Sequence, residues 1–405
     1  MTSRTDPARG GDAAENPWVL VAGGFHRDGG MDRLNHALAR QLLRSGCRVH
    51  LVCHRAHADL YHGGASVHIV PTPANSFLLG EFLLARRARQ VARSVVARFP
   101  LARVIVNGGN CPWPDINWVH CVHRAWRCCD EGAPGWFKLK NRASRWLARR
   151  DELCALRRAK IVIANSKRTR RDLLEIPGIR PDSVHVVYPG ADPGHCPPNP
   201  DRRAAVRARL SQGENRLLVL FVGALGQDFN KGFDVLFSAW QRLCARPQWD
   251  ADLAVAGGGR ALELWRGRVV QSRLDHRIRL LGFVDRIPEV LAAADLLVSP
   301  VRYEAYGLNV HEAICCGVPA MVTRTAGVAE RYPAELQPLL IEDPEDVDAL
   351  VAKLLRWRMA RDYWREKIVP FSEQLRSYTL DDMAKRMVEV CTEESRVDSA
   401  AAQRR

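Results

Sequence analysis

Two glutamates at a short spacing are the candidate ligands for a polar substrate. Glu304 and Glu312 are separated by seven residues, and Gly307 lies between them. The apolar run before them is typical of a buried strand that ends at Pro300, and residues 308–316 are typical of a helix. We therefore place Glu304 in a loop and Glu312 in the helix. Both side chains can then face one cavity at the carboxyl end of the strand, where open α/β sheets bind their ligands.

The residues between the two glutamates predict a phosphate-binding turn. Gly307 allows the chain to turn tightly, and the N–H groups of Gly307, Leu308 and Asn309 become free donors at a helix start. Such donors, together with the partial positive charge of a helix N-terminus, attract phosphate. Carboxylates suit hydroxyl groups instead, so the combination indicates a sugar nucleotide. Two glutamates that flank a turn can also be no more than a solvated surface with a helix cap.

This segment resembles the signature of the family 4 retaining glycosyltransferases, which have the GT-B fold. Gly317-Val-Pro319 and Gly327-Val-Ala-Glu330 stand where that family carries its Gly-x-Pro and Gly-x-x-Glu elements. The resemblance implies an α/β protein with two doubly wound parallel-sheet (Rossmann-like) domains that face an interdomain cleft. It also implies a C-terminal helix that crosses back to the first domain. Glu312 would hold the ribose hydroxyls, and Glu304 would hold the hydroxyls of the transferred sugar.

A lysine and an aromatic residue extend the resemblance toward the donor. Lys231, followed by Gly232, resembles the family lysine that contacts the donor pyrophosphate, where an ammonium group suits a leaving group that gains negative charge. Phe283 belongs to a Gly-Phe-Val triplet that in the family lies by the nucleotide base. The family usually has an arginine where this chain has Ala224, so phosphate neutralisation would fall to Lys231 and the helix start.

The first strand of the chain leads into a glycine-rich turn. Residues 17–24 predict a buried strand, residues 34–43 a helix and residues 47–53 a second strand, which together form a βαβ unit. The turn is neither Gly-x-Gly-x-x-Gly nor a P-loop. The resemblance implies that Gly29 and Gly30 let the first domain approach the donor diphosphate, although an ordinary tight turn would look the same.

A histidine near the end of a later strand is the remaining candidate. His120 resembles the family position at which a histidine reaches the donor sugar, and a neutral imidazole can donate or accept there. His123, three residues further on, is the alternative. A histidine near a strand end is otherwise often a polar group that hydrogen-bonds within the protein and has no role in binding.

The length and the composition fit a globular protein of two domains. The chain has 405 residues, and no run of about 18 apolar residues predicts a membrane span. Twelve cysteines lack any Cys-x-x-Cys spacing, so we expect buried thiols rather than a disulfide framework or a zinc ribbon. We expect a cytoplasmic protein. A proline-rich segment after residue 188 marks the boundary between the domains.

The predicted plan of the chain has six parts. They are a disordered tail (1–16), an N-terminal acceptor-side domain (17–190), a linker (191–214), a donor-binding domain (215–369), a helix on the first domain (370–395) and a tail (396–405).

The net charge of +15 favours anionic partners. Cations are scattered through the whole chain, and nine of them lie in residues 136–160, interleaved with Trp136, Phe137 and Trp146. This pattern is typical of an amphipathic helix at an anionic membrane, which would make the protein peripheral on its inner face, and equally of a solvated helix packed on its own domain. We find no nucleic-acid recognition motif and expect no specific nucleic acid partner.

The predicted activity is sugar transfer from a UDP- or GDP-linked donor to a hydroxyl group of a glycan, a glycolipid or a small-molecule glycoside. The resemblance implies retention of configuration, no metal and no cofactor. No residue is a convincing nucleophile, so we expect departure and attack on one face of the sugar, with the leaving phosphate helping to deprotonate the acceptor. The rival activities are a sugar-nucleotide epimerase or hydrolase on the same fold and a basic nucleic-acid-binding protein.

Overall fold

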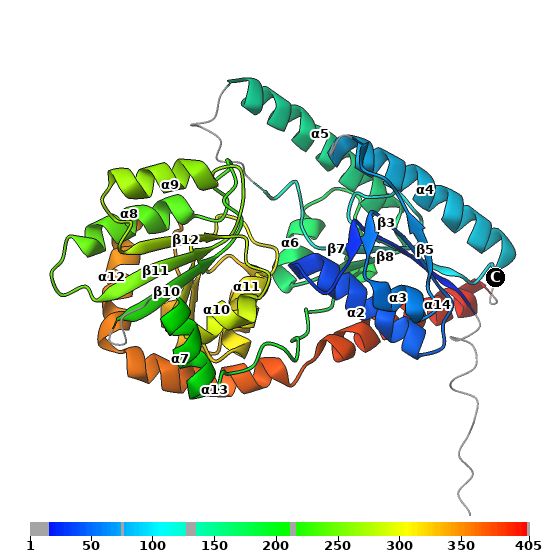
Figure 1. The fold of residues 1–405 in the computed structure, drawn as a ribbon. Helices are drawn as coiled ribbons and strands as arrows, with labels where there is room; N and C mark the ends of the chain where they lie inside the picture. Colours follow the sequence, from blue (N-terminus) through cyan, green and yellow to red (C-terminus); the bar gives the residue numbers. More distant parts are fainter. Residues whose placement is uncertain (1–15, 74–76, 127–134, 211–215, 403–405) are drawn as a thin grey trace, which may run out of the picture. The chain divides into compact units, whose positions relative to one another are not determined.

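The computed structural model describes residues 16–73, 77–126, 135–210 and 216–402. The predicted N-terminal tail therefore lies almost wholly outside the described residues, as do the side chains of Trp136 and Phe137. The chain divides into two compact units (Figure 1). The first unit holds residues up to 124, residues 139–189 and residues from 380 onward, and the second holds residues 125–138 and 190–379.

The first unit is built on a parallel sheet with the strand order β5-β3-β1-β6-β7-β8-β9. The inner strands β1, β7 and β8 are buried on both faces, as continuous apolar runs predict for parallel sheets, whereas the edge strand β5 is partly exposed. A short pair, β2 and β4, follows β1 and β3. The bounds are β1 Trp18–Val21, β2 Gly24–Phe25, β3 Val49–Cys53, β4 Arg55–Ala56, β5 Ser66–Ile69, β6 Arg103–Asn107, β7 Ile116–Val119, β8 Ile161–Ala164 and β9 Val184–Val186.

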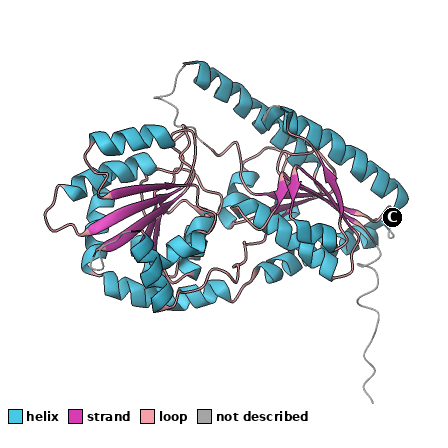
Figure 2. Cartoon of the chain, viewed as in Figure 1, coloured by secondary structure: helices cyan, strands magenta, loops and turns pink. Residues whose placement is uncertain are grey.

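Helices cover both faces of this sheet (Figure 2). The amphipathic helix α4 packs its apolar side on valines of β1, β3 and β6, including Val19, Val52 and Val104. Helix α14 packs against α2, where Arg40 and Arg44 both donate to Asp381. The helix bounds are α2 Gly30–Arg44, α3 Ala58–His62, α4 Phe77–Arg98, α5 Gly135–Arg158, α6 Lys167–Leu174, η3 Pro181–Ser183 and α14 Leu380–Ala402.

The second unit repeats this plan with the order β12-β11-β10-β13-β14, again in parallel. Helices lie on both of its faces (Figure 2). The strands are β10 Leu217–Val222, β11 Ala251–Ala256, β12 Ile278–Gly282, β13 Leu296–Ser299 and β14 Ala320–Val322. The helices are α7 Pro200–Arg209, α8 Phe233–Cys244, α9 Leu262–Gln271, α10 Ile287–Ala293, α11 Leu308–Cys315, η4 Gly327–Arg331, η5 Ala334–Leu339, α12 Val347–Met359 and α13 Arg361–Arg376.

Three segments differ from the sequence-based plan. Residues 191–214, expected to be a linker, contain α7, which packs on α10 and directs Arg203 and Arg207 to Asp295. The expected helix over 370–395 is two helices, because α13 ends at Arg376 and α14 begins at Leu380. Helix α14 also continues into the segment that was expected to be a tail.

The chain enters and leaves the second unit at neighbouring points. The Ala191 N–H donates to the Tyr378 carbonyl over 2.8 Å, and Ala191 pairs in parallel with Thr379. None of the described helices is long and apolar enough to cross a membrane.

Candidate active site

The predicted donor residues gather at the carboxyl ends of the strands in the second unit. Strand order reverses between β10 and β13, where Val219 pairs with Leu296. This switch point is where open parallel sheets bind ligands, since the connections on either side diverge there. Lys231 lies on the connection after β10, and Glu304 lies on the connection after β13.

A glycine allows these two connections to touch. Gly232 has φ 72°, and a Cβ added there would lie 1.9 Å from the carbonyl oxygen of Pro300. The amide side chain of Asn230 holds the same contact by accepting from the Tyr303 N–H and donating to the Tyr303 carbonyl. Glycine is thus required at position 232, both for its backbone conformation and for the close approach.

This contact brings Lys231 and Glu304 together. The Lys231 Nζ atom lies 2.5 Å from Glu304 Oε2, and the two side chains are 31% and 19% exposed. Lys231, which was predicted to bind the diphosphate, therefore forms an ion pair with Glu304, which was predicted to bind the sugar. A bound donor would have to draw Lys231 away from Glu304, or share it, in order to use its charge.

The turn before α11 has the geometry of an anion site. Gly307 has φ 110°, which favours glycine, and a Cβ there would lie 3.1 Å from Val328 Cγ1. Within the described residues, the N–H groups of Leu308 and Asn309 have no hydrogen-bond partner. The Asn309 side chain donates to the Val222 carbonyl over 2.7 Å, which fixes the helix start beside the end of β10.

Glu312 lies in the next turn of α11 and is 12% exposed. The His195 Nε2 atom lies 3.7 Å from Glu312 Oε2, and His195 is buried. His195 precedes α7, in the segment that was expected to be a linker. It was not predicted as a site residue, because it lies far from Glu312 in the sequence and belongs to no motif. An imidazole at this distance can orient the carboxylate.

The residue that was predicted to lie by the nucleotide base is an exposed aromatic residue. Phe283 follows β12 and is 78% exposed, so its ring is available to a planar base. Ala224, at the end of β10, is exposed and carries no charge. The side chain of Lys231 instead reaches the end of this strand, because its Cγ lies 3.3 Å from the position of a Cβ at Gly223.

In the first unit, Gly29 and Gly30 form the start of α2. Gly29 has φ 81° and nothing lies within 4 Å of its absent Cβ. The turn therefore leaves open space beside the helix N-terminus, as a backbone contact to an anion requires.

The first unit also holds the two candidate histidines. His120 follows β7, and burial lowers its pKa to about 3, so it is neutral at physiological pH. Its Nε2 atom has no hydrogen-bond partner among the described residues, which is uncommon for a buried polar atom and is expected where a ligand supplies one. The backbone of His123 is instead tied to α5, where its N–H donates to Glu152 and its carbonyl accepts from Arg149.

Family models match both units. Residues 28–195 match the model described as Glycosyltransferase Family 4, and residues 216–358 match the model described as Glycosyl transferases group 1. The chain belongs to the family 4 glycosyltransferases.

The curated relatives of this family 4 glycosyltransferase match only part of the chain, at low sequence identity. It is 28% identical over 239 residues to an uncharacterized glycosyltransferase of Methanocaldococcus jannaschii, covering 56% of this chain and 59% of the relative. It is 34% identical over 181 residues to a D-inositol 3-phosphate glycosyltransferase of Corynebacterium efficiens, covering 42% of each chain. The chain thus spans about half the length of the curated relatives that it matches.

The GT-B fold prediction is confirmed by a solved structure. The Anabaena protein HepE, crystallised with UDP and glucose, superimposes with a TM-score of 0.68 over 94% of this chain and all of its own, at 16% identity. The two parallel α/β units of this glycosyltransferase were therefore predicted correctly. The roles of the individual site residues stay predictions.

Proposed function

We propose that this chain transfers a sugar from a nucleoside diphosphate sugar to a hydroxyl group of an acceptor, with retention of anomeric configuration. The observation that carries the proposal is the Lys231–Glu304 ion pair at the strand switch point, beside the free N–H groups that begin α11. The pair supplies one group for phosphate and one for sugar hydroxyls at a single place.

Each residue has a distinct part in this proposal. Lys231 and the N–H groups of Leu308 and Asn309 would bind the diphosphate and stabilise the charge that develops as it leaves. Glu312 would accept hydrogen bonds from the ribose hydroxyls, and Glu304 from those of the transferred sugar. Phe283 would contact the base.

The first unit would complete the donor contacts. Gly29 and Gly30 are proposed to approach the diphosphate, and His120 to hydrogen-bond the sugar through its Nε2 atom. Replacing His120 with Ala should lower turnover about 5- to 30-fold, as expected for the loss of one or two kcal/mol of binding to the transition state. The binding of free nucleotide should not change, because a free nucleotide has no sugar at this position.

The donor is the first thing to test, and UDP is the first candidate because the HepE structure contains it. A ligand of the native state raises the melting temperature, and saturation at 100 times the Kd adds about 2.7 kcal/mol of stability. UDP or GDP at millimolar concentration should therefore give a clear shift. If neither nucleotide shifts the melting temperature, the donor site is assigned wrongly.

A panel of nucleotide sugars and hydroxyl acceptors, followed by mass, then tests transfer. The expected product is an acceptor that gains one sugar while the nucleotide diphosphate is released. Release of free sugar or formation of an isomer, with no acceptor consumed, would indicate the epimerase or hydrolase activity instead.

We also propose that α5 contacts an anionic membrane surface. Trp146 is 62% exposed and Leu139 is 71% exposed, and the Arg150 guanidinium lies 5.5 Å from the Trp146 ring centroid. An exposed aromatic side chain among cations suits the boundary between anionic headgroups and acyl chains. The chain should therefore sediment with vesicles of anionic lipid at low salt and be released as ionic strength rises.

The variant for this test must leave the fold intact. Changing Arg142 and Arg150 to Gln and Trp146 to Ser avoids Arg149, which donates to the His123 carbonyl. The matched control removes the same two charges elsewhere, at the exposed Arg246 and Arg260. Membrane binding should fall in the first variant only. Equal binding by both variants would exclude α5 as the contact.

A further inference from the structure

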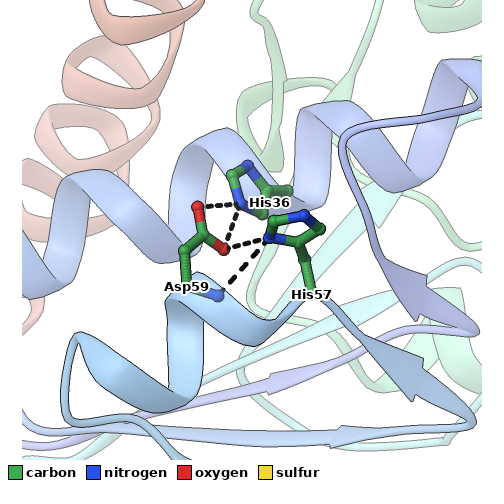
Figure 3. Close-up of side chains that lie close together, drawn as sticks. All are labelled: His36, His57 and Asp59. Carbon is green, nitrogen blue, oxygen red and sulfur yellow. Dashed lines mark hydrogen bonds and ion pairs between the residues drawn. The ribbon is translucent and has the colours of Figure 1, made fainter.

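Three potential metal ligands from different parts of the chain converge in the first unit (Figure 3). His36 comes from α2, His57 immediately precedes α3, and Asp59 lies in the first turn of α3. The His36 Nε2 atom lies 2.9 Å from Asp59 Oδ1, and the His57 Nδ1 atom lies 2.7 Å from the same oxygen. In the described part of the chain, no other set of three His, Cys, Asp or Glu side chains brings its donor atoms within 4.8 Å of one another.

Rigid elements hold these side chains in place. The backbone of His57 is fixed at the end of the β2–β4 pair, where its N–H donates to the Phe25 carbonyl over 2.8 Å. The His57 Nδ1 atom also lies 3.4 Å from the Asp59 backbone nitrogen, a capping contact that a bound ion would replace, because Nδ1 has a single lone pair. His36 faces inward from α2 and is 4% exposed. The ring planes of His36 and His57 are almost perpendicular, at 88°, so that each can direct one nitrogen at the same carboxylate.

We propose that His36, His57 and Asp59 form a binding site for a divalent transition metal of the zinc type. Two imidazoles and one carboxylate are ligands that zinc accepts, whereas magnesium and calcium select oxygen ligands. Tetrahedral zinc with bonds of about 2.0–2.1 Å separates its ligand atoms by about 3.3 Å. The ligand atoms of this site need to move apart by roughly half an ångström to admit the ion. Three protein ligands leave one position open to water.

Arg27 competes with the metal for the same carboxylate. Its guanidinium Nη2 atom lies 2.6 Å from Asp59 Oδ2, and the side chain is 56% exposed. A cation bound between the histidines and Asp59 would repel this guanidinium, which can move into water at little cost. Metal binding and the Arg27–Asp59 ion pair therefore oppose each other. Removal of Arg27 should therefore strengthen metal binding. A hydrogen-bonded cluster that only stabilises the fold predicts no such effect.

The experiment uses the full chain without a histidine tag and measures the uptake of Zn²⁺ and Co²⁺. Equilibrium dialysis should give one ion per chain, and Co²⁺ should show the visible absorption of a low-symmetry site. His57→Asn should abolish this uptake while keeping the helix cap, because asparagine is also a strong N-cap residue. Arg27→Gln should tighten metal binding at least threefold, because it removes the competing cation.

The matched control is a second histidine pair in the same unit. His50 Nδ1 and His68 Nε2 lie 3.4 Å apart, and no carboxylate of a described residue joins them in a set of three. Changing both to Gln should leave one metal ion per chain. Less than about one tenth of an equivalent in the wild type would overturn the proposal. So would unchanged uptake by His57→Asn, or a weaker affinity in Arg27→Gln.

Discussion

Replacing Lys231 with Met tests the central ion pair, because it should affect turnover far more than stability. The Lys231 and Glu304 side chains are both in partial contact with water. An ion pair of this kind contributes about 0–1 kcal/mol to folding, because solvent screens it. For a unit of this size, a change of that order moves the melting temperature by no more than about 4 °C.

Turnover should respond much more strongly. The charge on the diphosphate grows as the bond to the sugar breaks, and removal of one fixed donor from such a site costs about 3–4 kcal/mol in the transition state. At 1.36 kcal/mol for each factor of ten, kcat should fall by about 10²–10³. The measurement is kcat and KM for donor with the acceptor that the mass screen identifies, beside a thermal melt of the same preparation.

An exposed ion pair in the same unit provides the control. Arg242 pairs with Asp348, and both side chains are more than half exposed. Arg242→Met removes one cation of the unit without touching the strand switch point, and it should leave kcat and the melting temperature unchanged. The reasoning is refuted if Lys231→Met keeps kcat within about threefold of the wild type. It is equally refuted if Arg242→Met loses as much turnover.

Three further predictions follow from contacts in the structure. Glu312→Gln should weaken binding of free UDP about 10- to 100-fold by calorimetry, the loss expected for a charged hydrogen bond, whereas Glu304→Gln should not weaken it, because that variant releases Lys231 from its carboxylate. Burial raises the pKa of Glu152 from 4.5 to about 7, so the folded chain keeps a proton that the unfolded chain loses; stability should fall by about 3 kcal/mol as pH rises from 4.5 to 7, and Glu152→Gln should flatten this slope in denaturant titrations. Gly232→Ala should destabilise the second unit by more than about 2 kcal/mol, because its Cβ would meet the Pro300 carbonyl, whereas Gly267→Ala, in α9 with no atom within 4 Å, should stabilise it by up to about 1 kcal/mol in the same melts.

Residue types and their order along the chain were sufficient to predict the family and the two parallel sheets. Lys231 and Glu304 were each predicted as donor contacts, because both stand beside strand ends in a recognisable order. Their ion pair could not be predicted, since it depends on the approach of Gly232 to the Pro300 carbonyl, and 67 residues lie between these two positions in the chain. Sequence patterns report local periodicity, whereas contacts of this kind depend on tertiary packing.

The elements that differ from prediction have the same cause. The proline-rich composition of residues 191–214 predicted an open linker, but Asn199 caps α7 there and Pro200 occupies its first position, where proline is tolerated. Pro370 lies inside α13, although proline usually ends a helix. His195 is more than 100 residues from Glu312, so its place beside that carboxylate became visible only in the folded chain.

The meeting of Ala191 with Tyr378 and Thr379 has a consequence for how such a protein can change over evolution. A segment whose ends lie side by side can be replaced as one piece without stretching the polypeptide that flanks it, as in natural domain insertions. Residues 190–379 carry Lys231, Glu304, Glu312 and Phe283, and hence all the proposed contacts to the base, the ribose and one side of the diphosphate. Recombination at two neighbouring points would exchange this whole cassette for that of a relative. Such an exchange would change the specificity for the sugar donor in a single event, while the sequence of the first unit stays the same.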